Sequence, residues 1–156
     1  MEETLVEKNT DELLNILVNQ KPGDTEKYES TNEGELFSGE KPFSSYIREL
    51  LKAHGKTQQE VIARAGFSDK YGYALLAERK HTVRRDTILR ICLAGEFTLS
   101  QTQRVLRLYG MNELYPRIPR DAVLITFIGN GETDLSRINE SLSDKGFAPI
   151  PDGREE

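Results

Sequence analysis

Hydrophobic residues recur at helical spacing from Phe43 onward. Phe43, Ile47, Leu50 and Leu51 fall on one face of a helix, which should end near Gly55. The same criterion predicts four further helices, at residues 58–65, 69–79, 86–94 and 99–108. The pattern therefore predicts an all-α fold.

Residues 57–68 carry the signals of two short helices joined by a tight turn. Thr57 and Glu60 have the spacing of a capping box, in which each side chain accepts a hydrogen bond from the other residue's backbone N–H. Gly66 can adopt the left-handed conformation that ends a helix, and Ser68 can cap the next helix. This pattern is typical of a helix-turn-helix, whose second helix usually enters the DNA major groove.

An internal repeat follows. Residues 85–89, Arg-Asp-Thr-Ile-Leu, return 35 positions later as residues 120–124, Arg-Asp-Ala-Val-Leu. Residues Leu106 and Leu114 return 36 positions later as Leu142 and Ile150. A period in the mid-thirties is typical of stacked helix pairs. We therefore expect two similar helical hairpins, at residues 86–111 and 121–147, with the second packed on the helix-turn-helix core.

The first 42 residues differ in composition from the rest. Residues 10–20 combine a capping threonine, acidic residues in the first turn and an apolar stripe, which predicts a short amphipathic helix. Such a helix is marginal alone in water, so its apolar face needs the core, a second copy or a partner. The residues expected to face a partner are Leu13, Leu14, Ile16 and Leu17. Residues 21–42 are rich in Gly, Pro, Ser, Thr, Asn and Glu, which predicts a flexible linker.

Charge is distributed unevenly along the chain, whose net charge is −5. Residues 1–42 carry 4 basic and 11 acidic side chains, residues 43–130 carry 14 and 8, and residues 131–156 carry 3 and 7. A basic middle between acidic ends indicates that the middle segment has an anionic partner.

Composition argues against several other classes of protein. The single cysteine, Cys92, rules out an internal disulfide, and its apolar neighbours predict a buried side chain. The two histidines, His54 and His81, are paired with no nucleophile, and neither metal-ligand spacing nor a phosphate-binding glycine pattern is present. We therefore predict no enzyme, no metal site and no cofactor. A hydrophobic run of ~18 residues and a basic leader are also missing, which predicts a cytoplasmic protein without a membrane partner.

Three segments of the middle region carry a family resemblance: Thr57-Gln58-Gln59-Glu60, Ala65-Gly66-Phe67-Ser68 and Asp86-Thr87-Ile88-Leu89-Arg90-Ile91. They resemble the phage-repressor-like (Xre, Cro/CI-type) helix-turn-helix family. Residues 71–73, 98–103, 114–117 and 120–123 further resemble a bacterial branch with a C-terminal helical extension. The resemblance implies a five-helix lambda-repressor-like domain at residues 43–112, a hairpin extension at 113–150 and a tail at 151–156. The family usually has Gly after the recognition helix and Pro before the fourth helix, where this chain has Glu78 and Thr82-Val83.

Residues 69–79 are the candidate recognition helix. Lys70 can donate to guanine, and Tyr71 can reach a phosphate or a thymine methyl group, although Tyr71 is equally compatible with a core position. Gly72 is costly inside a helix and indicates close approach of another helix or of a phosphate. Basic residues after the helix would neutralise phosphates. The candidate DNA-binding residues are Gln58, Ser68, Lys70, Tyr71, Ala74, Arg79, Lys80, Arg84 and Arg85.

Two functions stay open at this stage. The leading hypothesis is a transcriptional regulator that binds double-stranded DNA, with a homodimer as a means of adding specificity to a thin set of base-reading residues. The alternative is a non-catalytic interaction adaptor that keeps the helix-turn-helix fold and docks a protein partner through its N-terminal helix.

Overall fold

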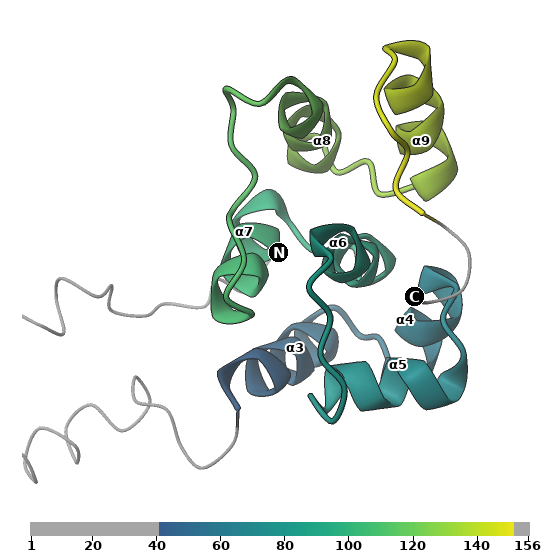
Figure 1. Cartoon of the computed structure of the whole chain (residues 1–156). Coiled ribbons are helices and arrows are strands. Elements are labelled where there is room, and N and C mark those ends of the chain that lie inside the picture. Colours follow the sequence, from purple (N-terminus) through teal and green to yellow (C-terminus); the bar gives the residue numbers. More distant parts are fainter. Residues whose placement is uncertain (1–40, 152–156) are drawn as a thin grey trace, which may run out of the picture. The chain divides into compact units, whose positions relative to one another are not determined.

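The computed structural model describes residues 41–151, and within this range it contains seven α-helices and no strand (Figure 1). The all-α prediction is confirmed. The amphipathic helix and the linker predicted before residue 41 lie outside the described residues. The helices are α3 (Pro42–Ala53), α4 (Gln58–Ala65), α5 (Asp69–Leu76), α6 (Arg85–Ala94), α7 (Leu99–Leu108), α8 (Pro119–Gly129) and α9 (Leu135–Asp144).

Helix α6 lies at the centre of the first five helices. It packs against α4 on one side and α7 on the other, while α3 packs against α7 and α5 against α4. All its residues from Thr87 to Ala94 are buried, which explains its nearly continuous apolar sequence. Cys92 is among them at 1% exposure, and burial raises the pKa of its thiol to about 12. The prediction of a buried cysteine is confirmed.

Local sequence signals set most helix boundaries. In the capping box of α4, the Glu60 N–H donates to Thr57 Oγ1 at 3.1 Å and the Thr57 N–H donates to Glu60 Oε1 at 2.9 Å. The bond from the Thr57 N–H is the main reason why the pKa of the Glu60 carboxyl lies below its usual range. Thr98 and Gln101 form a second capping box at the start of α7. Both helices begin where their capping residues predict.

Helix α5 ends earlier than its sequence indicates. The prediction extended it to Arg79, but the last helical residue is Leu76. Glu78 adopts φ 58°, in the left-handed region that favours glycine, and this conformation stops the helix. Ser44 of α3 stabilises the turn, because its hydroxyl lies 2.6 Å from Leu76 O and 3.0 Å from a carboxylate oxygen of Glu78 and can donate its one proton to either. A contact from a distant helix thus ends α5.

The internal repeat is confirmed as two helical hairpins, α6–α7 and α8–α9, which recur in their contacts as well as in their sequence. The Gln103 side-chain amide bonds both the N–H and the C=O of Leu114, at 2.8 and 2.9 Å. The Asn139 amide does the same to Ile150, 36 positions later in each case, at 2.7 and 2.8 Å. Each amide therefore ties the segment after its hairpin back to the hairpin's second helix.

Two Arg-Asp dipeptides join the hairpins. Arg85, at the start of α6, binds Asp121 at 2.5 Å, and Arg120, at the start of α8, binds both carboxylate oxygens of Asp86 at 2.9 and 3.1 Å. Asp121 is 1% exposed, and its second oxygen accepts the Tyr115 N–H at 2.9 Å. The arginine of each repeat is therefore paired with the aspartate of the other repeat.

The buried side chain of Arg90 fixes the helix-turn-helix to the core. Arg90 comes from α6 and is 3% exposed, and its Nε and Nη2 atoms donate to the Ala65 carbonyl at 3.0 and 2.5 Å. Ala65 is the last residue of α4, where helical carbonyls lack partners within the helix. The same guanidinium lies 4.2 Å from the centre of the Phe67 ring. Arg90 therefore holds the end of α4 and the following turn at once.

Gly72 sets how closely α4 and α5 approach. A Cβ atom at this position would lie 2.7 Å from Cγ1 of Ile62 and closer still to its Cγ2. Real Cβ atoms do not approach side-chain carbons this closely, so only glycine fits without displacement of Ile62. The predicted close approach of another helix is confirmed, and that helix is α4.

We expect Gly72→Ala to destabilise the protein by about 1–2 kcal/mol, because overpacking against Ile62 outweighs the better helix propensity of alanine. Gly129→Ala is the matched control. A Cβ atom there would meet only Leu99 Cδ2 at 3.8 Å, an ordinary contact. That substitution should be neutral or stabilising by up to about 1 kcal/mol. Urea unfolding of both variants checks the difference, and equal effects would contradict a steric role for Gly72.

We expect Arg90→Ala to cost about 2–4 kcal/mol of unfolding free energy, because it leaves the Ala65 carbonyl unpaired and opens a cavity beside Phe67. Arg107→Ala removes an arginine whose side chain is 53% exposed and paired with Glu113, so it should cost less than about 1 kcal/mol. Chemical denaturation measures both values. A loss in Arg90→Ala no larger than that in Arg107→Ala would refute the anchoring role of Arg90.

Candidate nucleic-acid interface

The turn between α4 and α5 leaves the first residues of α5 on the surface. Gly66 adopts φ 81°, as predicted, and the Tyr71 N–H donates to the Ser68 hydroxyl at 3.2 Å, so Ser68 caps α5. Ser68, Asp69 and Lys70 are exposed, and Ala74 on the next turn is half-buried. The N-terminal part of α5 therefore presents one cationic, one acidic and one hydroxyl side chain to solvent.

Tyr71 does not belong to this exposed group. It is 9% exposed, and its ring packs edge-on against Phe67 with the ring centres 5.4 Å apart. The prediction of an exposed Tyr71 is therefore wrong, and the core alternative describes its position. Tyr73 is instead the exposed tyrosine of α5, at 37%. Tyr71 is buried and Tyr73 is exposed because α5 packs on α4 through the face that carries Tyr71, Gly72 and Leu75.

The segment between α5 and α6, residues 77–84, is a basic loop. Arg79, Lys80 and Arg84 are exposed, and Val83 is 89% exposed at the same place. Arg79 and Lys80 both donate their backbone N–H groups to the Ala74 carbonyl, at 2.8 and 3.1 Å. The loop thus starts as a tight continuation of α5, with its cationic side chains directed to the surface.

Unlike Arg79, Lys80 and Arg84, Arg85 uses its guanidinium in contacts within the protein. Besides its ion pair with Asp121, its Nη1 atom donates to the carbonyls of Glu113 at 3.3 Å and Asn112 at 3.5 Å. These internal contacts leave the Arg85 guanidinium less accessible to a DNA phosphate than the prediction assumed. The sequence places Arg85 next to Arg84 but does not show that Asp121 lies beside Arg85 in the fold.

The start of α4 contributes a further polar position. Gln58 is the first residue of the helix and is half-buried. Nearby, Lys56 and Arg64 both pair with Glu96, at 3.1 and 2.6 Å. Arg64, followed by Lys56, holds the pKa of the Glu96 carboxyl below its usual range. These two cations are thus neutralised within the molecule, unlike the exposed cations of α5 and the basic loop.

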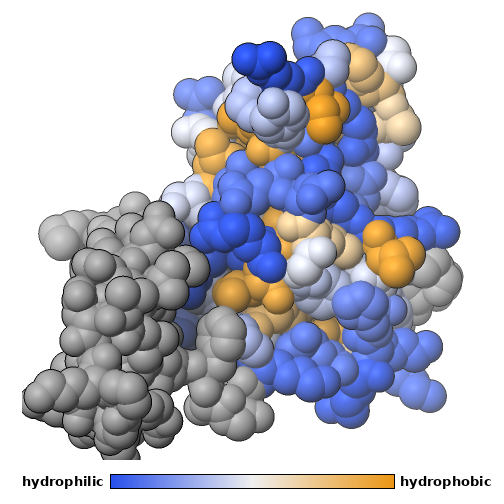
Figure 2. All heavy atoms as spheres, turned by 60° about the vertical axis from the view of Figure 1, so that its left-hand side comes forward, coloured by the Kyte–Doolittle hydropathy of each residue, from blue (hydrophilic) through white to orange (hydrophobic). Residues whose placement is uncertain are grey.

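The C-terminal hairpin does not cover this surface. Figure 1 places α8 and α9 at the end of the helical unit opposite α5. In Figure 2, which turns the side of α7 toward the reader, hydrophilic side chains predominate and hydrophobic ones form separate patches between them. Within the described residues, α5 and the basic loop are therefore open to a large ligand.

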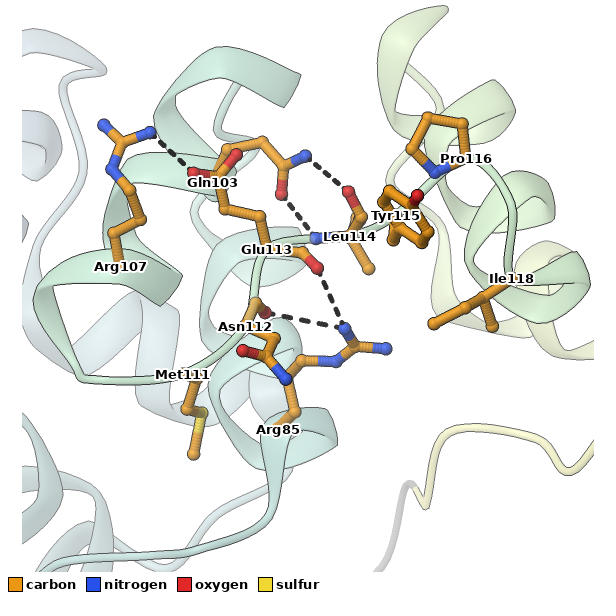
Figure 3. A pocket seen from close by; sticks show the side chains of 10 residues that line it. All are labelled: Arg85, Gln103, Arg107, Met111, Asn112, Glu113, Leu114, Tyr115, Pro116 and Ile118. Atoms are coloured by element: carbon orange, nitrogen blue, oxygen red, sulfur yellow. Dashed lines mark hydrogen bonds and ion pairs between the residues drawn. The ribbon is translucent and has the colours of Figure 1, made fainter.

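A cleft of about 700 Å³ lies where α7 leads into α8 (Figure 3). Its polar groups are largely used internally, since Gln103 bonds Leu114 and Arg107 pairs with Glu113 at 2.9 Å. Tyr115 and Ile118, at 52% and 45% exposure, form its apolar rim. This cleft contains none of the predicted DNA-binding residues except Arg85, which contributes to its wall.

Other kinds of site find no support in the part of the chain that the structure describes. Residues 41–151 contain no group of three or more His, Cys, Asp or Glu that could hold a metal ion. No helix in this range is long and apolar enough to cross a membrane. The candidate partner-binding residues Leu13, Leu14, Ile16 and Leu17 lie outside it.

Sequence reasoning missed two residues that position the interface. Arg90 had a usable signal, because it is the only charged residue in the apolar run from Ile88 to Leu93. Tyr109 had none, since an aromatic residue at the end of an amphipathic helix is normally read as core. Its hydroxyl accepts the Thr82 N–H of the basic loop at 3.0 Å.

Comparison with known families gives an independent result. Residues 46–101 match the family model described as the Cro/C1-type HTH DNA-binding domain. The match extends from within α3 to the start of α7 and contains α4, the turn, α5, the basic loop and α6. Neither curated proteins nor solved structures gave a match to the chain. Residues 46–101 therefore have the sequence features of a Cro/C1-type HTH DNA-binding domain, which confirms the predicted resemblance to the phage-repressor-like (Xre, Cro/CI-type) helix-turn-helix family over that segment.

Proposed function

We propose that this protein is a transcriptional regulator that inserts the N-terminal half of α5 into the DNA major groove. The match of residues 46–101 to a DNA-binding domain family supports binding to DNA in general. The placement of α5 rests on the usual docking of a helix-turn-helix, in which the second helix enters the groove and the first crosses the backbone.

The observation that carries this proposal is an uncompensated cationic surface. Four exposed basic side chains on α5 and the basic loop have no hydrogen-bonding or ionic partner within residues 41–151, namely Lys70, Arg79, Lys80 and Arg84. Elsewhere in the same domain, Lys56, Arg64, Arg85 and Arg120 are paired with carboxylates. A protein that binds DNA needs such unpaired cations, because neutralised phosphates release counterions.

The remaining residues divide by role in this proposal. Lys70 at the start of α5 would donate to guanine O6 and N7, and Ser68 and Ala74 would face the same groove. Arg79, Lys80 and Arg84 would contact phosphates and fix the register of the helix. Gln58, at the positive N-terminal end of α4, would bond a phosphate on the side of the groove opposite the loop.

We expect DNA binding to weaken steeply as salt concentration rises, and Arg84→Ala to lower the slope of log K against log[salt] by about 1, as loss of one phosphate contact predicts. The measurement is fluorescence anisotropy of a labelled duplex titrated with the full chain between 50 and 200 mM salt, roughly the range over which phosphate contacts dominate.

Lys145→Ala is the matched control, because Lys145 is an exposed cation beyond α9 at the far end of the unit. This substitution changes the net charge by the same amount as Arg84→Ala. If both variants lose the same slope, binding follows net charge and the proposed surface is wrong. If the wild-type chain fails to retain DNA even at low salt, the regulator function itself is wrong.

Lys70→Ala should change sequence preference as well as affinity. We expect it to cost about 1–3 kcal/mol on the best site and to relax the preference for guanine at one position, since a donor pair to O6 and N7 is lost. Selection of duplexes from a randomised pool with the wild type and the variant measures this directly. An unchanged base preference together with a reduced salt slope would reassign Lys70 to a phosphate.

A further inference from the structure

One buried tyrosine holds the middle of the basic loop. Tyr109, at the end of α7, is 7% exposed, and its hydroxyl accepts the backbone N–H of Thr82 at 3.0 Å. Its ring is stacked flat on His81, with ring centres 4.7 Å apart and 5° between the planes, and contacts Phe43 edge-on at 4.6 Å. The tyrosine therefore contacts two successive loop residues, one through its hydroxyl and one through its ring.

A second hydrogen bond joins Thr82 to Arg84, the last cation of the loop. Thr82 is 2% exposed, and its side-chain oxygen accepts the Arg84 N–H at 3.1 Å. Between these two residues Val83 is 89% exposed, so its side chain does not anchor the loop to the core. The contacts that Tyr109 makes with His81 and Thr82 thus lie between the two loop cations Lys80 and Arg84, and Thr82 passes them on to the backbone of Arg84.

We propose that Tyr109 is a positioning residue for DNA binding, and that its hydroxyl holds the basic loop in the conformation that presents Lys80 and Arg84 to phosphates. The inference rests on the proposed function and adds a residue that does not itself touch DNA. A loop held in its bound conformation spares the complex the entropic cost of ordering it. Without the hydroxyl, the Thr82 N–H loses its acceptor in a buried place, and the loop must move to regain one.

Tyr109→Phe removes only the hydroxyl and keeps the ring between His81 and Phe43. We expect it to weaken DNA binding by the full chain about 3–10-fold, the range that corresponds to one net hydrogen bond. Tyr46→Phe is the matched control, because Tyr46 is also 7% exposed and its ring contacts Arg104 rather than the basic loop. Its affinity should stay within about twofold of the wild type.

Two further measurements separate the local contact from its effect on DNA binding. Hydrogen exchange of the Thr82 amide, followed by NMR without DNA, should accelerate in Tyr109→Phe and stay unchanged in Tyr46→Phe. In double-mutant cycles the Tyr109→Phe effect on DNA affinity should shrink in an Arg84→Ala background and persist in a Lys70→Ala background, because only Arg84 lies on the loop.

The outcomes separate the two proposals. If the wild type does not bind DNA at low salt, the proposed function fails, and the exchange of Thr82 still reports whether Tyr109 holds the loop. If the wild type binds and Tyr109→Phe binds within twofold of it, the positioning role is wrong. Should Tyr109→Phe unfold, Thr82→Val tests the same linkage by removing the acceptor of the Arg84 N–H. That variant should weaken binding to a similar extent, and an unchanged affinity would overturn the proposal.

Discussion

The guanidinium of Arg90 on the Ala65 carbonyl is the contact on which the helix-turn-helix depends. It crosses from the central helix α6 to the last residue of α4, and its flat face covers the ring of Phe67 in the turn. The carbonyls at the end of a helix lack hydrogen-bond partners within the helix. A charged group that binds such a carbonyl and also packs on the following turn therefore fixes the direction in which α5 continues from the turn. The contact between Gly72 and Ile62 then sets how far α5 lies from α4. Two tertiary contacts thus orient α5, the helix that we propose to contact DNA.

The sequence was sufficient to predict those features of the fold that depend on residues close together in the chain. The capping boxes at Thr57 and Thr98 and the left-handed Gly66 place α4 and α7 and the turn, because each involves groups no more than four positions apart. The internal repeat was visible because its second copy keeps the Arg-Asp start of the hairpin and the spacing of Leu106 and Leu114 in Leu142 and Ile150. Periodicity, caps and repeat together account for the whole order of helices from residue 42 to residue 144.

The sequence was insufficient where a distant group decides the outcome. The early end of α5 requires Ser44, 34 positions before Glu78, to bind the left-handed turn. Tyr71 and Tyr73 are indistinguishable by type, and only the packing of α5 on α4 buries the first and exposes the second. Arg84 and Arg85 are adjacent and chemically identical, yet one faces solvent while the other binds Asp121 from the second repeat. A basic run therefore overstates the charge available to a ligand unless its internal partners are known.

The reciprocal bonding of the two Arg-Asp dipeptides has a consequence for how this protein can change over generations. Arg85 is matched to Asp121 and Arg120 to Asp86, and each arginine also binds a backbone carbonyl that follows a hairpin's second helix, at Asn112 and at Ala148. A replacement in one dipeptide leaves an opposite charge stranded in the other, so neither repeat can drift alone. We therefore expect these four positions to vary only as a set.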